Sequence, residues 1–420
     1  MKFSSTMVVL LFLFSVLHSS ANALPLRKNV FAEYHLVPEG SSYALYLTYR
    51  IEYGALIFVK SDSGFTASYT FAVERTDTAE KFIARDYSER KINVKTIAET
   101  KSDQAIQGIL KYSFSGKKEK LLFSVFDRNA DHDINRYHFV IQPPEGRKST
   151  NDFFVVEQNG VADLHSYKLA NFNGILPFSE KSYSLLVLAD SASCKFKYLR
   201  AAAKDSSFLL KCDTAICASI TLDSSAKGVQ LQATPDPAGK NWILLFKSVN
   251  RDLYPASYSL SLTESDTTKK ITLRPFSVIW LDKPRTTEKL DYAYKIMDNI
   301  EKSFQNSPYY KKGNKDEIVE LLQVWKPYDP TPLTSYNERM AEFFARVDYS
   351  LEHFSTLKGT DGAETDRGEM YIRLGAPSKT ERSTTKSGKI AEIWTYDKLQ
   401  KDFIFIDVGG NGAFDLKDKK

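Results

Sequence analysis

The sequence has 420 residues, of which 42% are hydrophobic and 26% charged, with 57 Lys and Arg against 52 Asp and Glu. This composition excludes a disordered, collagen-like or coiled-coil chain, and the length allows two to four domains of roughly 100–200 residues each. The net charge of +5 is small and is not gathered in one tract, so no nucleic-acid partner is expected.

The first 23 residues predict a secretory signal peptide. Lys2 is followed by an apolar run from Met7 to Leu17, and Ala21-Asn22-Ala23 has the small-x-small pattern of a cleavage site before Leu24. The run is shorter than the about 20 apolar residues that a membrane-spanning helix needs. We therefore expect an exported protein of the periplasm or of the extracellular side of the cell surface, with no transmembrane segment after signal removal.

Residues 24–145 predict a β-sandwich. From Tyr43 to Tyr53 the odd positions are aromatic or aliphatic and the even ones mostly polar, which indicates a strand with one buried face, and Phe65–Val73 alternates in the same way. Short antiparallel strands at this spacing favour the immunoglobulin type. Further strands are expected at 106–115, 120–127 and 135–142.

A second immunoglobulin-like sandwich is predicted over 181–282, after a connector at 146–180. Its turn is the cluster Pro235–Gly239. Its expected strands are 183–188, 208–210, 216–222 and 242–247. The predicted fold is therefore two tandem immunoglobulin-like all-β sandwiches followed by one further domain.

Residues 283–420 predict an α+β domain, because apolar residues recur there at helical spacing before short strands return. The Pro-rich link 325–332 separates two helical stretches. Ser335 and Glu338 have the spacing of a capping box at the start of the next helix. The expected helices are 290–304, 318–325 and 335–357, and the expected strands 369–374, 391–396, 402–407 and 412–416.

The segment Gly362–Pro377 (GAETDRGEMYIRLGAP) resembles the signature of the bacterial GWxTD-domain family. Asp329–Pro332 and Arg346–Tyr349 upstream, and Glu392–Tyr396 and Phe403–Asp407 downstream, are also similar to that family. The signature positions that match are Gly362, Thr365, Asp366, Arg367, Gly368, Gly375, Pro377 and Trp394. The resemblance implies an exported, multidomain bacterial envelope protein of undefined biochemical activity.

Two interpretations of the signature segment follow from its residues. In the first, Thr365 and Asp366 cap backbone amides, and Arg367 pairs with one of three acidic side chains and fixes the turn on the long helix. The carboxylates considered for that pair are Asp366, Asp348 and Glu369. In the second, Thr365, Asp366 and Arg367 form a polar binding site on a rigid loop. Ala363 replaces the family's Trp, a loss that is tolerated if the Trp only packs but removes a ligand contact if it lines a pocket.

The three cysteines leave several pairings open. Cys212 and Cys217 flank Asp213-Thr214, so a hairpin would allow a disulfide between them, and Cys194 is the other possible partner. Three unpaired thiols are an equal alternative. No His lies near them in sequence, so no zinc site is expected.

No metal or cofactor is expected elsewhere. Asp127–Asp133 alternates oxygen ligands like a calcium loop, but His132 occupies the glycine position and His138 the position of the bidentate Glu. We interpret the segment as a polar hairpin loop. His353 has no nearby Ser elbow or Cys partner, so no catalytic triad is assigned and the catalytic residues stay unknown.

Two functions are consistent with these features. The first is a non-enzymatic structural or protein-interaction role in the envelope, exerted through the C-terminal domain on a protein or glycan partner. The alternative is an exported hydrolase acting on peptide or glycan through carboxylates of the same domain, which would need two acidic side chains about 5–10 Å apart in a pocket. The sequence leaves the oligomeric state open.

Overall fold

The computed structural model describes residues 30–102, 104–143, 152–157, 165–190, 194–204, 206–225, 228–263, 270–306 and 318–417. The predicted signal peptide, residues 1–23, lies outside the described residues. Within these ranges no helix has both the length and the hydropathy to cross a bilayer.

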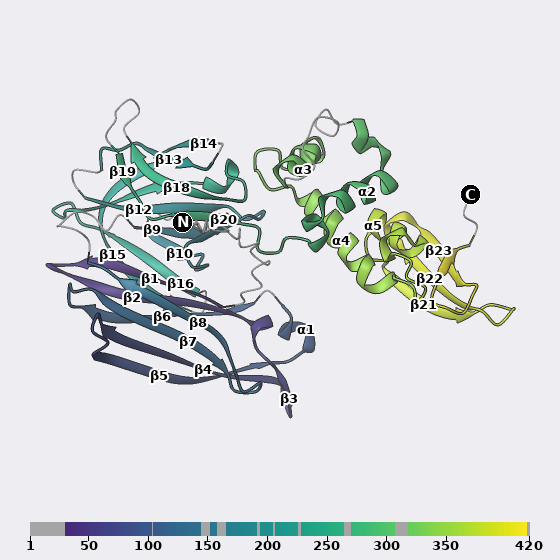
Figure 1. Ribbon diagram of the computed structural model, residues 1–420, viewed down its shortest axis with the longest axis horizontal. Coiled ribbons are helices and arrows are strands. Elements are labelled where there is room, and N and C mark those ends of the chain that lie inside the picture. Colours follow the sequence, from purple (N-terminus) through teal and green to yellow (C-terminus); the bar gives the residue numbers. More distant parts are fainter. Residues whose placement is uncertain are drawn as a thin grey trace, which may run out of the picture.

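The N-terminal sandwich consists of two antiparallel sheets. One has the strand order β1-β2-β6, and the other has the order β3-β4-β7-β8 with β5 paired to β4 (Figure 1). The elements are β1 (Val30–Glu39), β2 (Ser42–Glu52), β3 (Val59–Ser61), β4 (Gly64–Asp77), β5 (Phe82–Val94), α1 (Ile97–Thr100), β6 (Ala105–Phe114), β7 (Glu119–Asp127) and β8 (His132–Ile141). The predicted strands of this region are confirmed, whereas β1, β3 and β5 are additional.

The strand predicted from Tyr43 to Tyr53 is buried on both faces, so the expectation of one solvated face is wrong. Leu45 and Leu47 face the interior of the N-terminal sandwich, as predicted. Ala44 and Tyr46 on the other face are also buried, because the second β domain packs against them. An alternating sequence shows only that the two faces of a strand differ in polarity. Tyr, Ala and Thr, which occupy the more polar face of this strand, can also pack against another domain.

The second β domain contains a closed barrel with the order β10-β16-β15-β17-β12-β9 and a sheet with the order β11-β20-β18-β13-β14, to which β19 adds through β18. Its strands are β9 (Phe153–Glu157), β10 (Ser166–Leu169), β11 (Ile175–Pro177), β12 (Tyr183–Asp190), β13 (Tyr198–Ala202), β14 (Ser207–Lys211), β15 (Thr214–Ser225), β16 (Gly228–Pro235), β17 (Asn241–Phe246), β18 (Ala256–Thr263), β19 (Lys270–Thr272) and β20 (Phe276–Ile279).

Two sequence predictions for this region need correction. The segment 146–180 is not simply a connector, because its described part supplies β9, β10 and β11. The domain also differs from the predicted simple sandwich, because one of its sheets closes on itself and β11 pairs in parallel with β20. The barrel closes only because β10 pairs with β16 and β12 with β17, strands more than 50 residues apart, and such pairing leaves no local signal in a sequence.

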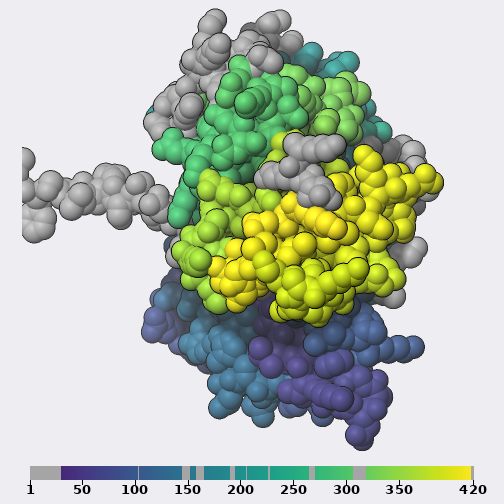
Figure 2. Space-filling model, turned by 90° about the vertical axis from the view of Figure 1, so that its right-hand side faces the viewer, coloured from purple at the N-terminus to yellow at the C-terminus, as the bar shows by residue number. Residues whose placement is uncertain are grey.

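The C-terminal region packs helices against an antiparallel sheet with the order β21-β22-β23-β24. Its main elements are α2 (Leu290–Ile300), α3 (Ile318–Trp325), α4 (Glu338–Phe354), α5 (Asp366–Leu374), β21 (Lys379–Thr384), β22 (Ile390–Tyr396), β23 (Lys401–Asp407) and β24 (Phe414–Leu416). The chain is therefore β-rich and multidomain, with an α+β C-terminal region. Figure 2 shows this C-terminal sheet, in yellow, projecting in front of the N-terminal sandwich below it.

Two local predictions in this region are wrong. The segment 369–374 is not a strand but the body of α5. Helix α4 is capped by Asn337, whose side chain accepts from the Met340 amide at 2.9 Å, and not by Ser335. The Ser335 hydroxyl instead donates to the carbonyl of Arg251 in the second β domain at 2.7 Å. Ser335 is thus committed to an interdomain contact that sequence spacing does not reveal.

An ionic cluster, Glu33, His35, Asp152 and Arg274, joins the N-terminal sandwich to the second β domain. The His35 Nδ1 lies 3.4 Å from the Asp152 carboxylate, and the Arg274 Nε donates to the same carboxylate at 2.6 Å. The Glu33 carboxylate lies 3.7 Å from both His35 and Arg274. We call these four residues the interdomain cluster.

Candidate functional site

The signature segment starts α5 and anchors it to the rest of the C-terminal region. Thr365 is the N-cap: its hydroxyl accepts from the Gly368 amide at 3.1 Å and donates to the Gly362 carbonyl at 2.8 Å. The Asp366 carboxylate accepts from the Leu416 amide in β24 at 2.7 Å. Both side chains therefore satisfy backbone groups of this domain.

Arg367 is buried between α5 and the sheet. Its guanidinium donates to the Glu392 carboxylate at 3.0 Å and to the Gly412 carbonyl at 3.3 Å, and it lies 4.1 Å from the centre of the Phe414 ring. The indole N–H of Trp394 donates to the other oxygen of Glu392 at 3.1 Å. Burial lowers the pKa of Arg367 below its usual value, and the adjacent Glu392 carboxylate offsets only part of this effect. We call Arg367, Glu392 and Trp394 the signature cluster.

The predicted partners of Arg367 are therefore wrong. Glu369 pairs with Arg373 one turn along α5, at 3.2 Å. Asp348 accepts from the backbone amide of Arg285 at 2.6 Å. The real partner, Glu392, lies on β22, and no residue spacing within the signature points to it.

The glycines of the signature permit close backbone contacts. A Cβ on Gly362 would lie 2.0 Å from the Ser350 carbonyl oxygen of α4, and one on Gly368 would lie 1.9 Å from the Gly362 carbonyl oxygen. Gly375 ends α5 with φ of +80°, and its carbonyl accepts from the Tyr396 hydroxyl at 2.8 Å. Ala363, where the family has Trp, is 2% exposed and belongs to the main core. The position is thus one of packing.

Of the alternatives left open for the cysteines, the structure has the three thiols and no disulfide between Cys212 and Cys217. The Cys212 thiol donates to the Thr214 carbonyl at 3.3 Å and the Cys217 thiol to the Gly239 carbonyl at 3.3 Å. The hairpin on which the prediction depends does not form, because β14 belongs to the open sheet and β15 to the barrel.

The other candidate motifs also have structural roles. The Asp127 carboxylate accepts from the amides of Ile57, Asn129 and Ala130, so the calcium-like segment is a polar hairpin loop. His353 stacks on Tyr349 with ring centres 3.8 Å apart. In the part of the chain that the structure describes, no three His, Cys, Asp or Glu residues gather as metal ligands would.

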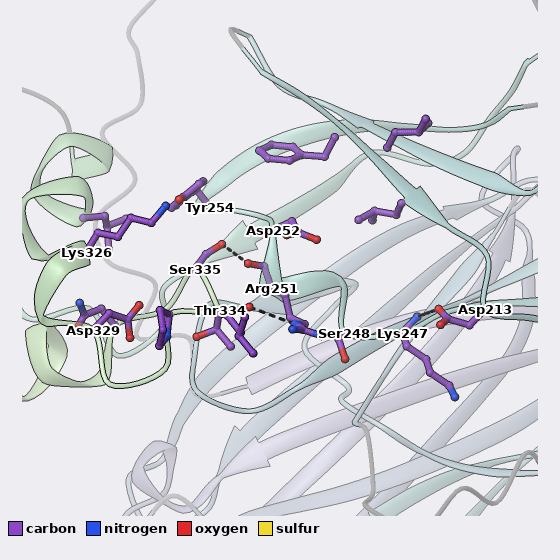
Figure 3. A pocket seen from close by; sticks show the side chains of 17 residues that line it. Asp213, Lys247, Ser248, Arg251, Asp252, Tyr254, Lys326, Asp329, Thr334 and Ser335 are labelled. Atoms are coloured by element: carbon purple, nitrogen blue, oxygen red, sulfur yellow. Dashed lines mark hydrogen bonds between the residues drawn. The ribbon is translucent and has the colours of Figure 1, made fainter. Parts of the chain in front are cut away.

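A cleft of about 820 Å³ separates the second β domain from the helices that follow it. Its walls carry both signs of charge: Lys326 and Asp329 lie at one end, and Asp213 and Lys247 at the other (Figure 3). The other residues that line it are Phe208, Leu209, Leu210, Ser248, Arg251, Asp252, Tyr254, Leu322, Pro332, Leu333, Thr334, Ser335 and Asn337.

One wall of the cleft is formed by the loop 330–335, and the second β domain holds this loop in place. The Arg251 Nε donates to the Leu333 carbonyl at 3.2 Å, and the Ser335 hydroxyl donates to the Arg251 carbonyl at 2.7 Å (Figure 3). A second hollow of about 700 Å³ lies beside the same loop. The loop 330–335 and the second β domain, which both border the cleft, are therefore hydrogen-bonded to each other through Arg251.

The opposite wall includes strand β14, whose outer edge is unpaired among the described residues. The Cys212 amide donates to the Lys197 carbonyl at 2.7 Å, and the Ala203 amide to the Ser206 carbonyl at 2.8 Å. Hydrogen-bonded pairs alternate in an antiparallel ladder, so every second residue of β14 directs its N–H and C=O away from β13. By the register, these residues are Ser207, Leu209 and Lys211.

Sequence reasoning missed this cleft entirely. Its lining comes from β14, from the turn after β17 and from the loop between α3 and α4, and the first and last of these segments lie more than a hundred residues apart. The only local signal is the Pro-rich composition of 325–332, which predicts a rigid link but not a wall of a cleft.

Comparisons with known proteins add little to this geometry. No protein-family model matches the chain, and no curated protein matches it. Among solved structures, the chain is similar to the C-terminal domain of the Streptococcus pyogenes antigen I/II-family protein AspA. That match covers 60% of this chain and 99% of the other, with 7% sequence identity and a TM-score of 0.17. A TM-score this low carries no argument about fold or function.

Proposed function

We propose that this protein is an exported, non-enzymatic interaction protein of the bacterial envelope that binds an extended polypeptide segment of a partner in the cleft beside β14. The free edge of β14 next to a charged cleft is the observation that carries this proposal. Membership of the GWxTD-domain family and immunoglobulin-like ancestry of the two β domains are part of the same proposal and rest on the sequence.

An edge strand is a template for a further strand, because its outward N–H and C=O groups have no partner. In β14 these groups belong to Ser207, Leu209 and Lys211, and Leu209 is also 49% exposed. A bound peptide would gain main-chain hydrogen bonds along β14. The cleft beside the strand would accept its alternate side chains.

The charges of the cleft support a polypeptide ligand of mixed charge. Lys326 and Asp329 at one end, and Lys247 and Asp213 at the other, place opposite charges close together at both ends (Figure 3). Complementary charge sets the orientation and selectivity of a ligand more than its affinity. A ligand of a single charge would meet a like charge at both ends.

The hydrolase alternative is less well supported, because the carboxylates that it would use have other tasks. Asp366 accepts from the Leu416 amide, Asp348 from the Arg285 amide, and Glu392 from Arg367 and Trp394. A catalytic carboxylate has to be free to accept a proton or attack a substrate.

The proposal is tested by selecting random peptides from a display library on the purified protein and measuring their binding by biolayer interferometry. Leu209→Pro removes an outward N–H without removing a donor to β13, so we expect it to weaken binding by roughly ten-fold. Leu209→Ala keeps the N–H and is the matched control. If no peptide is selected, or if both variants bind like the wild type, the cleft is not a strand-binding site.

Export is tested separately. We expect the chain isolated from envelope fractions to begin at Leu24, as determined by N-terminal sequencing, and to keep its N-terminal segment uncleaved when Ala21 and Ala23 are replaced by bulky residues. A cytoplasmic wild-type chain with an intact N-terminus would contradict the proposed address.

A further inference from the structure

Strand β5 forms a long free edge of the N-terminal sandwich. It pairs with β4 over its length, and no other strand of the described residues pairs with it. Phe82, Ile83 and Tyr87 on this strand are 61%, 44% and 62% exposed. A long strand with one unpaired edge and exposed large side chains has the properties of a pairing surface.

From Ala84 to Val94 the residues of β5 alternate between the two faces of its sheet, and a bulge at Ile83 interrupts this alternation. Arg85 lies opposite Glu74 of β4, with the guanidinium Nε 4.0 Å from the Glu74 carboxylate, and Glu89 lies opposite Thr70. Since Arg85, Tyr87 and Glu89 share one parity, they form a row on the outer face of the sheet. Each of the three is exposed.

This row is complementary to itself in one antiparallel register. A two-fold axis perpendicular to the sheet and passing between two Tyr87 residues places Arg85 of each copy opposite Glu89 of the other. Opposite charges that lie directly across from each other stabilise a strand pair.

The neighbouring two-fold registers bring like charges together. An axis at Ser88 places Arg85 opposite Lys91 twice and Asp86 opposite Arg90 twice, so its attractive and repulsive pairs cancel. An axis at Asp86 places Asp86 opposite itself, and an axis at Glu89 does the same for Glu89. Like charges directly opposite destabilise a strand pair, so the charges favour the register centred on Tyr87.

We propose that two copies of this chain associate through β5, as antiparallel strands related by a two-fold axis at Tyr87. The sheets of the two N-terminal sandwiches then form one continuous sheet. Charged residues on an edge strand normally block pairing with other strands. In this strand they also select a single partner, a second copy in a single register.

A charge exchange tests the proposal by sedimentation velocity of the purified protein over a range of concentrations. We expect the wild type to dimerise and Glu89→Arg, which faces Arg85 of the other copy twice, to weaken dimerisation by roughly ten-fold or more. The double variant R85E/E89R restores opposite charges and should restore the dimer. Arg136→Glu, on exposed β8 at the other end of the same sheet, is the matched control and should have no effect.

Cross-linking tests the register directly. In the proposed dimer, Tyr87→Cys places two thiols opposite each other, so a short bis-maleimide should give a covalent dimer in high yield. Ser88→Cys places each new thiol opposite Asp86 on the other face of the sheet and should give much less. A wild type that is monomeric at all concentrations, or equal cross-linking of the two variants, would overturn the proposal, and a circular dichroism spectrum of each variant confirms that it is folded.

Discussion

The signature cluster and the interdomain cluster both bury charged side chains, but they connect different levels of the structure. Arg367 and Glu392 are 25 residues apart and fix one helix to one sheet within the C-terminal domain. His35 and Asp152 are 117 residues apart, and Arg274 is a further 122 residues along the chain, so their contacts connect two domains. The first cluster shapes a domain, and the second sets how two domains meet.

The two clusters also differ in the number of charges that they balance. In the signature cluster one guanidinium pairs with one carboxylate. The Trp394 indole N–H also donates to this carboxylate, and the Gly412 carbonyl also accepts from the guanidinium. In the interdomain cluster two carboxylates face a histidine and an arginine. Because burial of an unpaired charge costs far more than burial of a pair, loss of one member should be most damaging where no other charge can compensate.

Arg367→Met is therefore expected to have the largest effect. It leaves the Glu392 carboxylate buried without its cation, which costs about 3–5 kcal/mol of stability and unfolds the C-terminal domain first. Urea unfolding followed by tryptophan fluorescence measures the loss, since Trp394 lies beside Glu392. Arg373→Met, on the same helix but in an exposed pair with Glu369, is the control and should be close to neutral. A loss below about 1 kcal/mol for Arg367→Met would contradict the role assigned to the pair.

Gly368→Ala tests whether the close packing around the signature cluster matters as much as its charges. The added Cβ would lie 1.9 Å from the Gly362 carbonyl oxygen, so the backbone has to shift at a cost of about 1–3 kcal/mol. The midpoint of thermal unfolding reports the change. Gly409→Ala, where the nearest atoms lie 3.4 Å from the new Cβ, should leave the midpoint almost unchanged. Equal effects of the two substitutions would show that the contact is not tight.

The stability of the interdomain cluster should depend on pH. Two carboxylates beside His35 outweigh its burial and raise its pKa to about 9, while Arg274 and His35 lower the pKa of Asp152 to about 2. The stabilisation from His35 is complete below its unfolded pKa of about 6.5 and is lost as the pH rises through 9. The stabilisation from Asp152 is complete above about 4 and is lost as the pH falls through 2.

We therefore expect the domain contact to weaken by about 1–3 kcal/mol between pH 6.5 and 9.5. Calorimetric unfolding across this range measures the change, and it should be absent in His35→Gln, which no longer titrates. Alkaline destabilisation of the same size in His35→Gln would assign the effect to another group. At pH 7, Asp152→Asn should destabilise the protein, because two cations lose their shared carboxylate.

The contrast between the clusters also explains which parts of the structure could be predicted from sequence. Local periodicity identified β2, β4 and α4, because each buries one regular stripe of residues. It failed for 369–374, where Met370, Ile372 and Leu374 alternate like a strand but Thr365 caps a helix. A cap satisfies the amides at the helix start and determines the conformation of a short segment more strongly than its side-chain pattern does.

The candidate sites were less predictable than the fold. The signature pointed to Arg367 but not to Glu392. The barrel and the cleft depend on contacts between residues more than 60 apart, and the interdomain cluster on contacts across more than a hundred residues. Those pairings are decided by which faces remain to be covered once each sheet has formed. Information of this kind is spread over the whole chain and is not carried by any motif in it.

Thr365→Ala should have the smallest effect and separates capping from ion pairing within the signature. The substitution removes the acceptor for the Gly368 amide at the start of α5, which typically costs about 1 kcal/mol, and leaves Arg367 and Glu392 in place. Urea unfolding should show this loss for Thr365→Ala, while Thr365→Ser, which keeps the hydroxyl, should remain close to the wild type. If Thr365→Ala matched Arg367→Met, the cap and the ion pair would form one cooperative unit, and the cluster would have to be redefined to include the helix start. If it were neutral, α5 would be held in place by the Arg367–Glu392 pair and the packing of Gly368 against Gly362, and the Thr of the signature would need another explanation.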